Sequence, residues 1–455
     1  MSFSVATRRA VSRPAGALAI VLVPLALFAC ARRQAVTDGF RAGGDTAELT
    51  RLHERYRVGA IGTREFTHGE LWNALGPLVD AAGGPEREEA GRSAEGRPIY
   101  RVRYGAGPTR VLLWSQMHGN ESTATMALAD LFRFLAEAPD DPRARRLAER
   151  LTIEAVPMLN PDGAERFQRR NAMGIDINRD ARAQATPEGR LLRAVHERFR
   201  PHFGFNLHDQ DVRARVGTSD RLAAIALLAP PFGPAREDDA VRMRAKRVAA
   251  VVRMAAEPLV AGHVARYDDT FNPRAFGDLM QSWGTSTVLI ESGGWRNDPE
   301  KQYLRRVNFV ALLTALDAIA TEAYAAADPA RYEELPENGR SVNDLLVRGS
   351  TVVVPGLDPY RADVTINFAD PLARRGGRIV EVGDLAESAA RDTIDATGLF
   401  LHPGPEALAQ DAPGRAVLIV DRPASFVLRR GRDAASAVVW RMAAETPRQA
   451  PPLVQ

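Results

Sequence analysis

Short apolar runs alternate with amphipathic segments between residues 99 and 326, and this alternation constrains the fold more than any other feature of the sequence. The apolar runs end at turn residues and predict strands, whereas the amphipathic segments repeat their apolar positions at helical spacing. Strands that are apolar on both faces are typical of parallel sheets covered by helices on both sides. The sequence therefore predicts an α/β fold with a mixed, largely parallel central sheet and helices on both faces.

The individual elements follow from the same patterns. Strands are predicted at residues 99–105, 110–116, 151–159, 203–209 and 286–291. Helices are predicted at residues 122–138, 187–200, 242–256 and about 300–326. Asn160 to Gly163 is expected to form a turn, and the run "GIDI" before Asn178 has a strand-like composition.

The chain is too long, at 455 residues, for one compact core, and its composition changes near residue 340. Beyond that point Val, Ile and Thr are frequent and turn residues recur at short intervals, which predicts a small C-terminal β domain. The predicted organisation is a signal peptide at 1–30, an N-terminal extension at 31–64, an α/β domain at 65–326, a linker at 327–340 and an accessory β domain at 341–455.

The N-terminus has the pattern of an export signal. Arg8, Arg9 and Arg13 precede an apolar run at residues 15–30, which is too short and too close to the start to be a typical membrane-spanning helix. The run closes on Cys30, the only cysteine, and "LFAC" resembles a bacterial lipoprotein box. This resemblance implies an exported protein at the periplasm or cell surface, held to the membrane through lipid on Cys30. A plain signal peptide, cut nearby, is the alternative.

The charge distribution argues against nucleic acid as a partner. Arginine supplies nearly all of the positive charge, the formal net charge is only +3, and the sequence has no basic stretch with interleaved aromatic residues.

Polar side chains collect where the predicted strands end, which is where open α/β sheets place their ligand sites. His118 and Glu121 follow one strand and, as an i, i+3 pair at the start of a helix, point to one side. His208 ends a second strand. Two histidines and a carboxylate leave a fourth position for water, which is typical of catalytic zinc. Glu291 ends a third apolar strand, where an acidic group is costly unless it is paired or functional. The simpler alternative is that these are ordinary buried or loop polar groups.

A further segment, "NPDGAERFQRRNAMGIDINRD" at residues 160–180, contains Arg169, Asn178 and Arg179. With "HGNE" upstream and His208 downstream, the order of these motifs resembles that of the zinc metallocarboxypeptidases of the carboxypeptidase A and B type. The resemblance covers roughly residues 65–320, so the α/β domain would be the catalytic domain.

The resemblance implies roles for the metal-side residues. His118, Glu121 and His208 would bind one Zn²⁺ per chain, Arg169 would polarise the scissile carbonyl, and Glu291 would be the general base. These roles suit the side chains, because a carboxylate can take a proton from a water molecule and pass it to the leaving amine.

It also implies a substrate, namely a peptide with a free C-terminus. Asn178 and Arg179 would bind its terminal carboxylate, and Tyr267 is the best candidate for the tyrosine that caps the substrate. Asp180 stands where the family pattern usually has asparagine, and the residue that sets side-chain preference cannot be aligned. Arg170 is an alternative to Arg169 through a shift of one residue.

Two other functions stay open. A zinc-dependent deacylase or amidase of the same fold would act on N-acyl amino acids or muropeptides, although the "NPDG" segment favours a peptidase. A non-catalytic surface-binding protein is the second alternative, and the complete set of ligands together with Glu291 argues against it.

Overall fold

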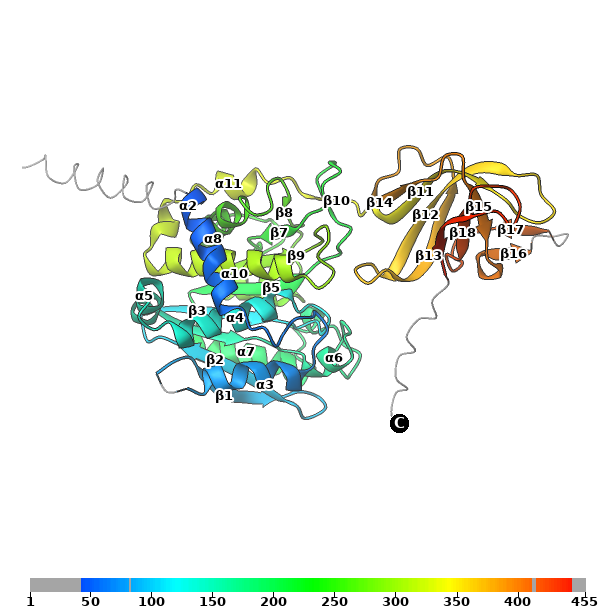
Figure 1. The fold of residues 1–455 in the computed structure, drawn as a ribbon. Helices are drawn as coiled ribbons and strands as arrows, with labels where there is room; N and C mark the ends of the chain where they lie inside the picture. Colours follow the sequence, from blue (N-terminus) through cyan, green and yellow to red (C-terminus); the bar gives the residue numbers. More distant parts are fainter. Residues whose placement is uncertain (1–41, 82, 411–414, 444–455) are drawn as a thin grey trace, which may run out of the picture. The chain divides into compact units, whose positions relative to one another are not determined.

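The computed structural model describes residues 42–81, 83–410 and 415–443. It forms an α/β region at residues 42–339 and a C-terminal β region at residues 343–442, both labelled in Figure 1. The predicted export signal, including Cys30, lies outside the described residues. Within the described part of the chain, no helix has the length and apolarity needed to cross a membrane.

The α/β region is built on an eight-stranded mixed sheet with the order β1-β2-β4-β3-β5-β9-β7-β8 (Figure 1). Its four central strands, in the order β4, β3, β5 and β9, are parallel, while β1, β2 and β7 introduce antiparallel pairs. The strands are β1 Glu86–Arg92, β2 Pro98–Tyr104, β3 Thr109–Ser115, β4 Leu151–Val156, β5 Phe203–Asp209, β7 Ile225–Leu228, β8 Val264–Arg266 and β9 Ser286–Ser292. The prediction of a mixed, largely parallel sheet is confirmed.

Helices cover both faces of this sheet, as predicted. Alternate residues of β3 belong to different hydrophobic clusters, with Val111 and Leu113 on one face and Leu112 and Trp114 on the other. The first face packs against α2 Ala42–Tyr56, α3 His68–Val79, α4 Thr123–Glu137, α5 Pro142–Arg150, α8 Ala240–Ala256 and α10 Gln302–Ala320. The second face packs against α7 Pro187–Phe199 and α9 Phe276–Ser282.

Four predictions about local structure were wrong. The strand predicted at residues 151–159 ends at Val156. Residues 160–163 are not a simple turn, because Pro161–Glu165 forms the short helix α6, with the Asn160 side chain accepting a hydrogen bond from the Gly163 N–H. The "GIDI" run is not a strand and leads into a 3₁₀ turn, η1, at Ile177–Arg179. The helix predicted at about 300–326 ends at Ala320, and a 3₁₀ turn, η2, follows at Ala323–Ala326.

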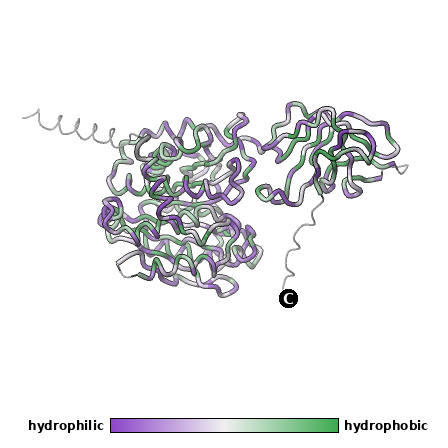
Figure 2. Tube along the Cα trace, viewed as in Figure 1, coloured by the Kyte–Doolittle hydropathy of each residue, from purple (hydrophilic) through white to green (hydrophobic). Residues whose placement is uncertain are grey.

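The C-terminal β region has its own hydrophobic cluster, formed by residues that include Val347, Val364, Ile379 and Leu428. Its main sheet has the order β13-β12-β11-β15-β18-β19, and β14 pairs with β11. These strands are β11 Asn343–Val352, β12 Tyr360–Asp370, β13 Arg375–Gly383, β14 Ala390–Asp395, β15 Phe400–Pro403, β18 Phe426–Arg429 and β19 Val438–Met442. The hydrophobic clusters of both regions can be followed as green parts of the trace in Figure 2.

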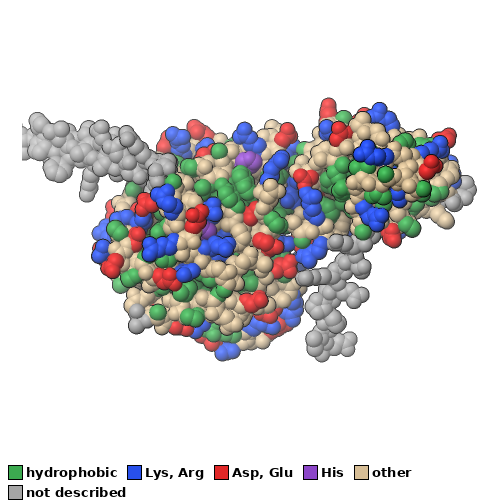
Figure 3. Space-filling view, in the orientation of Figure 1, with side chains coloured by type: hydrophobic (Ala, Val, Ile, Leu, Met, Phe, Trp, Pro, Cys, Tyr) green, Lys and Arg blue, Asp and Glu red, His purple; other side chains and the backbone are tan. Residues whose placement is uncertain are grey.

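Four short strands complete the described fold. In the α/β region β6 Arg215–Val216 pairs with β10 Asn338–Gly339, and in the β region β16 Leu408–Gln410 pairs with β17 Ala416–Leu418. Two short helical turns, α11 Ala330–Glu333 and η3 Pro405–Ala407, lie between strands. On the face shown in Figure 3, acidic and basic side chains of the described residues are interspersed rather than gathered by sign.

Candidate active site

The predicted site residues lie at the carboxyl ends of three adjacent parallel strands. His118 and Glu121 belong to the loop between β3 and α4, His208 is in β5, and Glu291 is in β9. His208 and Glu291 are direct partners in the register of β5 and β9. The sheet therefore brings together residues that are far apart in the sequence.

The loop that carries His118 is shaped by close contact with α6. The Asn160 N–H donates to the Gln116 carbonyl oxygen at 3.0 Å, and its side-chain amide donates to the Met117 carbonyl at 3.2 Å. A Cβ atom on Gly119 would lie only 2.0 Å from the carbonyl carbon of Gly163. Only glycine fits at residue 119, so the "HGNE" and "NPDG" motifs are parts of one packed structure.

His118, Glu121 and His208 form a compact, buried ligand set. The Glu121 carboxylate lies 2.8 Å from Nδ1 of His118 and 2.7 Å from Nδ1 of His208, and the two Nδ1 atoms are 3.2 Å apart. Their ligand atoms all lie within 4.8 Å of one another. Tetrahedral zinc with ligands at ~2.1 Å places its ligand atoms about 3.4 Å apart. The set therefore fits one zinc ion after small movements of the side chains.

The Nε2 atom of His118, on the far side of the ring from Glu121, forms a hydrogen bond with Asp176. Nε2 lies 2.9 Å from the Asp176 carboxylate and donates to it, so Nδ1, which faces Glu121, is the nitrogen that would coordinate a metal once its own proton is released. Burial lowers the pKa of His118, but Glu121 and Asp176 outweigh it and raise the pKa to about 9. Burial also lowers the pKa of His208, despite Glu121. Two buried imidazoles around one carboxylate form an environment that favours a cation.

Arg169, rather than Arg170, reaches this set. Its Nη1 donates to Glu121 at 3.0 Å, and its Nε and Nη2 donate to the Asp176 carboxylate at 3.1 and 3.0 Å. Arg170 turns away and donates to the carbonyl of Gly174. The Arg169 side chain is 44% exposed, so its guanidinium is accessible from the cavity.

Glu291 lines the same cavity of about 330 Å³ as the ligand set. It is buried, and its Oε2 has no hydrogen-bond partner among the described residues. Burial raises its pKa well above the usual range, and the nearby Glu121 carboxylate adds to this effect. A buried carboxyl group with a free oxygen beside a metal-ligand set is suited to exchange protons with a bound molecule.

Asn178, Arg179 and Tyr267 also line this cavity. Arg179 makes no ion pair with another described residue, and its Nη1 donates only to the Asn178 carbonyl at 2.8 Å. The Asn178 side chain accepts a hydrogen bond from the Phe276 N–H at 3.0 Å, which fixes it against α9. The pKa of Tyr267 is raised, first by Glu291 and then by burial, so its hydroxyl stays protonated. The structure thus brings every predicted site residue to one cavity.

Sequence patterns did not reveal two supporting carboxylates. Asp176 was passed over because its partner His118 is 58 residues away, although its position two residues before Asn178 was a usable signal. Asp209 has a side chain that is 9% exposed, accepts a hydrogen bond from Thr123 at 2.7 Å and lies 3.1 Å from Nζ of Lys301. Its backbone N–H also donates to Glu121 at 3.2 Å, so it helps to position that ligand.

Loss of one ligand should remove the metal. We expect His208→Ala to lose most of its bound zinc, because the two remaining ligands cannot complete a catalytic site. His202→Ala, at the opposite end of β5, should retain one zinc per chain. Elemental analysis of the purified variants tests this, and equal zinc in both would show that His208 is not a ligand.

Part of the α/β region is similar to known carboxypeptidases. The model of the zinc carboxypeptidase family matches residues 85–214. Carboxypeptidase 2 of Trichophyton tonsurans is 34% identical over 100 residues, which cover 22% of this chain and 18% of that protein. Carboxypeptidase D of Mus musculus is 31% identical over 159 residues, which cover 25% of this chain and 12% of that protein. The chain thus spans less than a fifth of the length of these relatives.

Among solved structures, a metallo-carboxypeptidase from Burkholderia cenocepacia is similar, with a TM-score of 0.44 and 21% identity over 56% of this chain and 70% of that one. A metallo-carboxypeptidase from Pseudomonas aeruginosa, in complex with (2-guanidinoethylmercapto)succinic acid, has a TM-score of 0.45 and 18% identity over 57% and 70% of the two chains. The region that matches the family model carries His118, Glu121, Arg169, Asn178, Arg179 and His208. Residues 85–214 of the chain thus resemble the zinc carboxypeptidase family.

Proposed function

We propose that this protein is a zinc-dependent carboxypeptidase that removes C-terminal residues from peptides. The observation that supports this most strongly is the composition of one cavity. The ligand set, a buried Glu291 with a free oxygen, and an Arg179 without an anionic partner all line it. A peptide with a free C-terminus would supply the missing anion, and its last peptide bond would then lie beside the ligand set.

His118, Glu121 and His208 are the residues that would hold the metal. When bound, the zinc ion supplies a water molecule of lowered pKa and polarises the substrate carbonyl. Glu291 takes a proton from the attacking water and delivers it to the amine that leaves. Its unpartnered Oε2 and its position beside His208 in the sheet support this assignment.

The other residues orient the substrate. Arg169 is proposed to donate to the carbonyl oxygen as negative charge develops there, because its guanidinium is already aligned by two hydrogen bonds to Asp176. Arg179, with Asn178, is proposed to pair with the terminal carboxylate. Tyr267, which lines the same cavity, is proposed to cover the substrate and to donate a hydrogen bond from its protonated hydroxyl.

A deacylase of the same fold is the second candidate. It would use the same metal chemistry, and an N-acyl amino acid also presents a free carboxylate to Arg179. Incubation of the enzyme with matched peptides, N-acyl amino acids and muropeptides, followed by mass spectrometry, distinguishes the two. Release of free C-terminal amino acids from peptides supports the first function, and cleavage restricted to acyl groups supports the second.

We further propose that the protein is exported and anchored through Cys30, on the basis of the basic and apolar pattern that precedes this cysteine. Wild type expressed in a bacterial host should partition into the membrane fraction and incorporate labelled fatty acid, whereas Cys30→Ser should do neither. Equal amounts of soluble protein from the two forms would contradict the anchor.

A further inference from the structure

The turn between β12 and β13, at residues 371–374, borders the candidate active site although it belongs to the C-terminal β region. Residues 370–372 line a cavity of about 300 Å³ together with Glu121, Arg169 and Arg213. This cavity shares Glu121, Arg169 and residues 209–211 with the one that holds the complete ligand set. The two cavities therefore meet at the ligand set.

The turn is held in place by ion pairs to the active-site loops. Arg64 donates to both oxygens of Asp370 at 2.8 Å, and its own carbonyl accepts a hydrogen bond from the Ser122 hydroxyl at 2.6 Å, next to Glu121. Arg213, five residues after His208, donates to Asp344 at 2.9 Å and to the Phe368 carbonyl at 2.8 Å. The half-buried Arg64 and Arg213 thus connect the β12–β13 hairpin to the segments that carry two of the ligands.

The lining residues of the two cavities indicate which part of a bound peptide would occupy the second cavity. Asn178 and Arg179 line the first cavity only, so a terminal carboxylate and the residue released with it would lie there. The rest of the peptide must leave the ligand set on the other side, where residues 370–372 lie. This step rests on the proposed carboxypeptidase function.

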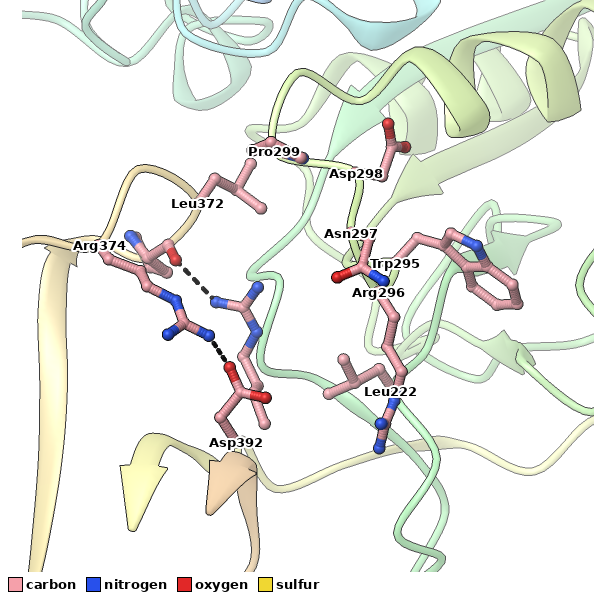
Figure 4. Close-up of a pocket in the computed structure, with 11 residues that line it drawn as sticks. Leu222, Trp295, Arg296, Asn297, Asp298, Pro299, Leu372, Arg374 and Asp392 are labelled. Atoms are coloured by element: carbon pink, nitrogen blue, oxygen red, sulfur yellow. Dashed lines mark hydrogen bonds and ion pairs between the residues drawn. The ribbon is translucent and has the colours of Figure 1, made fainter. Parts of the chain in front are cut away.

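A third cavity, of about 340 Å³, continues beyond the turn. Pro371 and Leu372 line it together with Trp295 and Pro299. Figure 4 shows Leu372 facing the loop that follows β9 and carries Trp295 and Pro299. Arg374 pairs with Asp392, and Arg391 donates to the Pro371 carbonyl at 2.9 Å. Because these charged groups are already paired, the part of the turn that a bound peptide could contact consists of the apolar side chains of Pro371 and Leu372.

We propose that Pro371 and Leu372 form a binding surface for the part of the substrate on the amino side of the scissile bond, and that it favours apolar residues there. The C-terminal β region would then contribute directly to the selection of substrates. Substrates long enough to reach the turn would gain from it, and minimal substrates would not.

Peptides of two lengths test this. A blocked dipeptide and a pentapeptide with the same C-terminal dipeptide and apolar preceding residues are compared on wild type, Leu372→Ala and Val380→Ala. Val380 is a matched control, since it is exposed on β13 of the same hairpin and outside these cavities. Leu372→Ala is expected to lower kcat/KM for the pentapeptide about tenfold, as for lost apolar contact in a binding pocket, and to leave the dipeptide and the control unchanged. An equal effect on both peptides, or none on either, would overturn the proposal.

A binding measurement separates this proposal from the proposed function. In Glu291→Gln carrying Leu372→Cys, the pentapeptide should slow alkylation of the new cysteine, the dipeptide should not, and Val380→Cys in the same background should be alkylated at the same rate with either. Protection of Leu372→Cys supports the surface even if wild type cleaves neither peptide, a result that would count against the carboxypeptidase function alone. No protection by the pentapeptide would overturn the binding surface.

Discussion

Glu291→Gln is expected to lower kcat by ~10² to 10⁴-fold while leaving one zinc bound per chain, because loss of a general acid–base group has effects of this size. Glutamine has nearly the same shape and can occupy the buried position, but it cannot accept a proton from water. The side chain is not a member of the ligand set, so metal content should not change. Single-turnover kinetics and elemental analysis on the same preparation provide both values.

Two control variants distinguish loss of the general base from loss of the metal and from a general effect of replacing a buried glutamate. Glu121→Gln should lose zinc as well as activity, because Glu121 bridges toward both histidines. Glu154→Gln, a buried glutamate of β4 that pairs with Arg101 and Arg198 outside this cavity, should keep both. Near-normal kcat in Glu291→Gln would show that Glu291 is not the general base and has only a structural role. Another group would then have to accept the proton.

Much of the α/β region could be predicted because its central strands are buried on both faces. β5 was predicted at residues 203–209 and is found at Phe203–Asp209, since a short, mainly apolar run that follows Pro201 is typical of a buried strand. β4 was predicted three residues too long. Its strand pairing ends at Val156, directly before Pro157, which has no N–H to donate.

Elements whose position depends on distant partners could not be predicted in this way. β1, with the sequence "EREEAGR", has almost no apolar residues and is an edge strand defined by its pairing with β2. Two other elements that the sequence analysis missed are, by contrast, fixed locally. The 3₁₀ turn at Ile177–Arg179 forms because the Asp176 side chain accepts a hydrogen bond from the Asn178 N–H. The helix α6 did have a signal, because Asn160 followed by Pro161 is a typical helix start.

The candidate site also combines features that the local sequence predicts with features that depend on distant contacts. The candidate ligands His118, Glu121 and His208 could be predicted because each stands at the end of a recognisable strand, and parallel strands end at one edge of the sheet. The choice between Arg169 and Arg170 depended on which way each side chain turns, which follows from contacts with Asp176 and Gly174. The position of Leu372 near Glu121 depends on ion pairs between residues 131 and 306 positions apart, and no local pattern encodes it.

The enzyme is expected to require a free carboxylate at the C-terminus of its substrate. Arg179 is exposed to the cavity and has no anionic partner among the described residues, so the substrate carboxylate is its natural counterion. Pairing of the two groups would fix the distance from the chain end to the ligand set, and this positioning would explain cleavage of the last peptide bond only. Amidation of the terminus removes the charge. Loss of such a charged hydrogen-bond partner costs ~2–5 kcal/mol, which is roughly 30- to several-thousand-fold in kcat/KM.

One peptide and its C-terminal amide, compared on three forms of the enzyme, test this expectation. Wild type should prefer the free carboxylate by the factor above, and Arg179→Ala should lose most of that preference because it cleaves the acid poorly. Arg170→Ala is the matched control: Arg170 lies on the same loop and donates to the Gly174 carbonyl rather than lining the cavity, so this variant should discriminate as wild type does. Amidation changes only the peptide and does not alter zinc binding or Glu291. Any difference in kcat/KM between the two peptides therefore reports on the pairing of the peptide terminus with Arg179. If wild type cleaves both peptides equally, Arg179 does not select the chain end, and the cavity must then be open to internal peptide bonds or acyl groups.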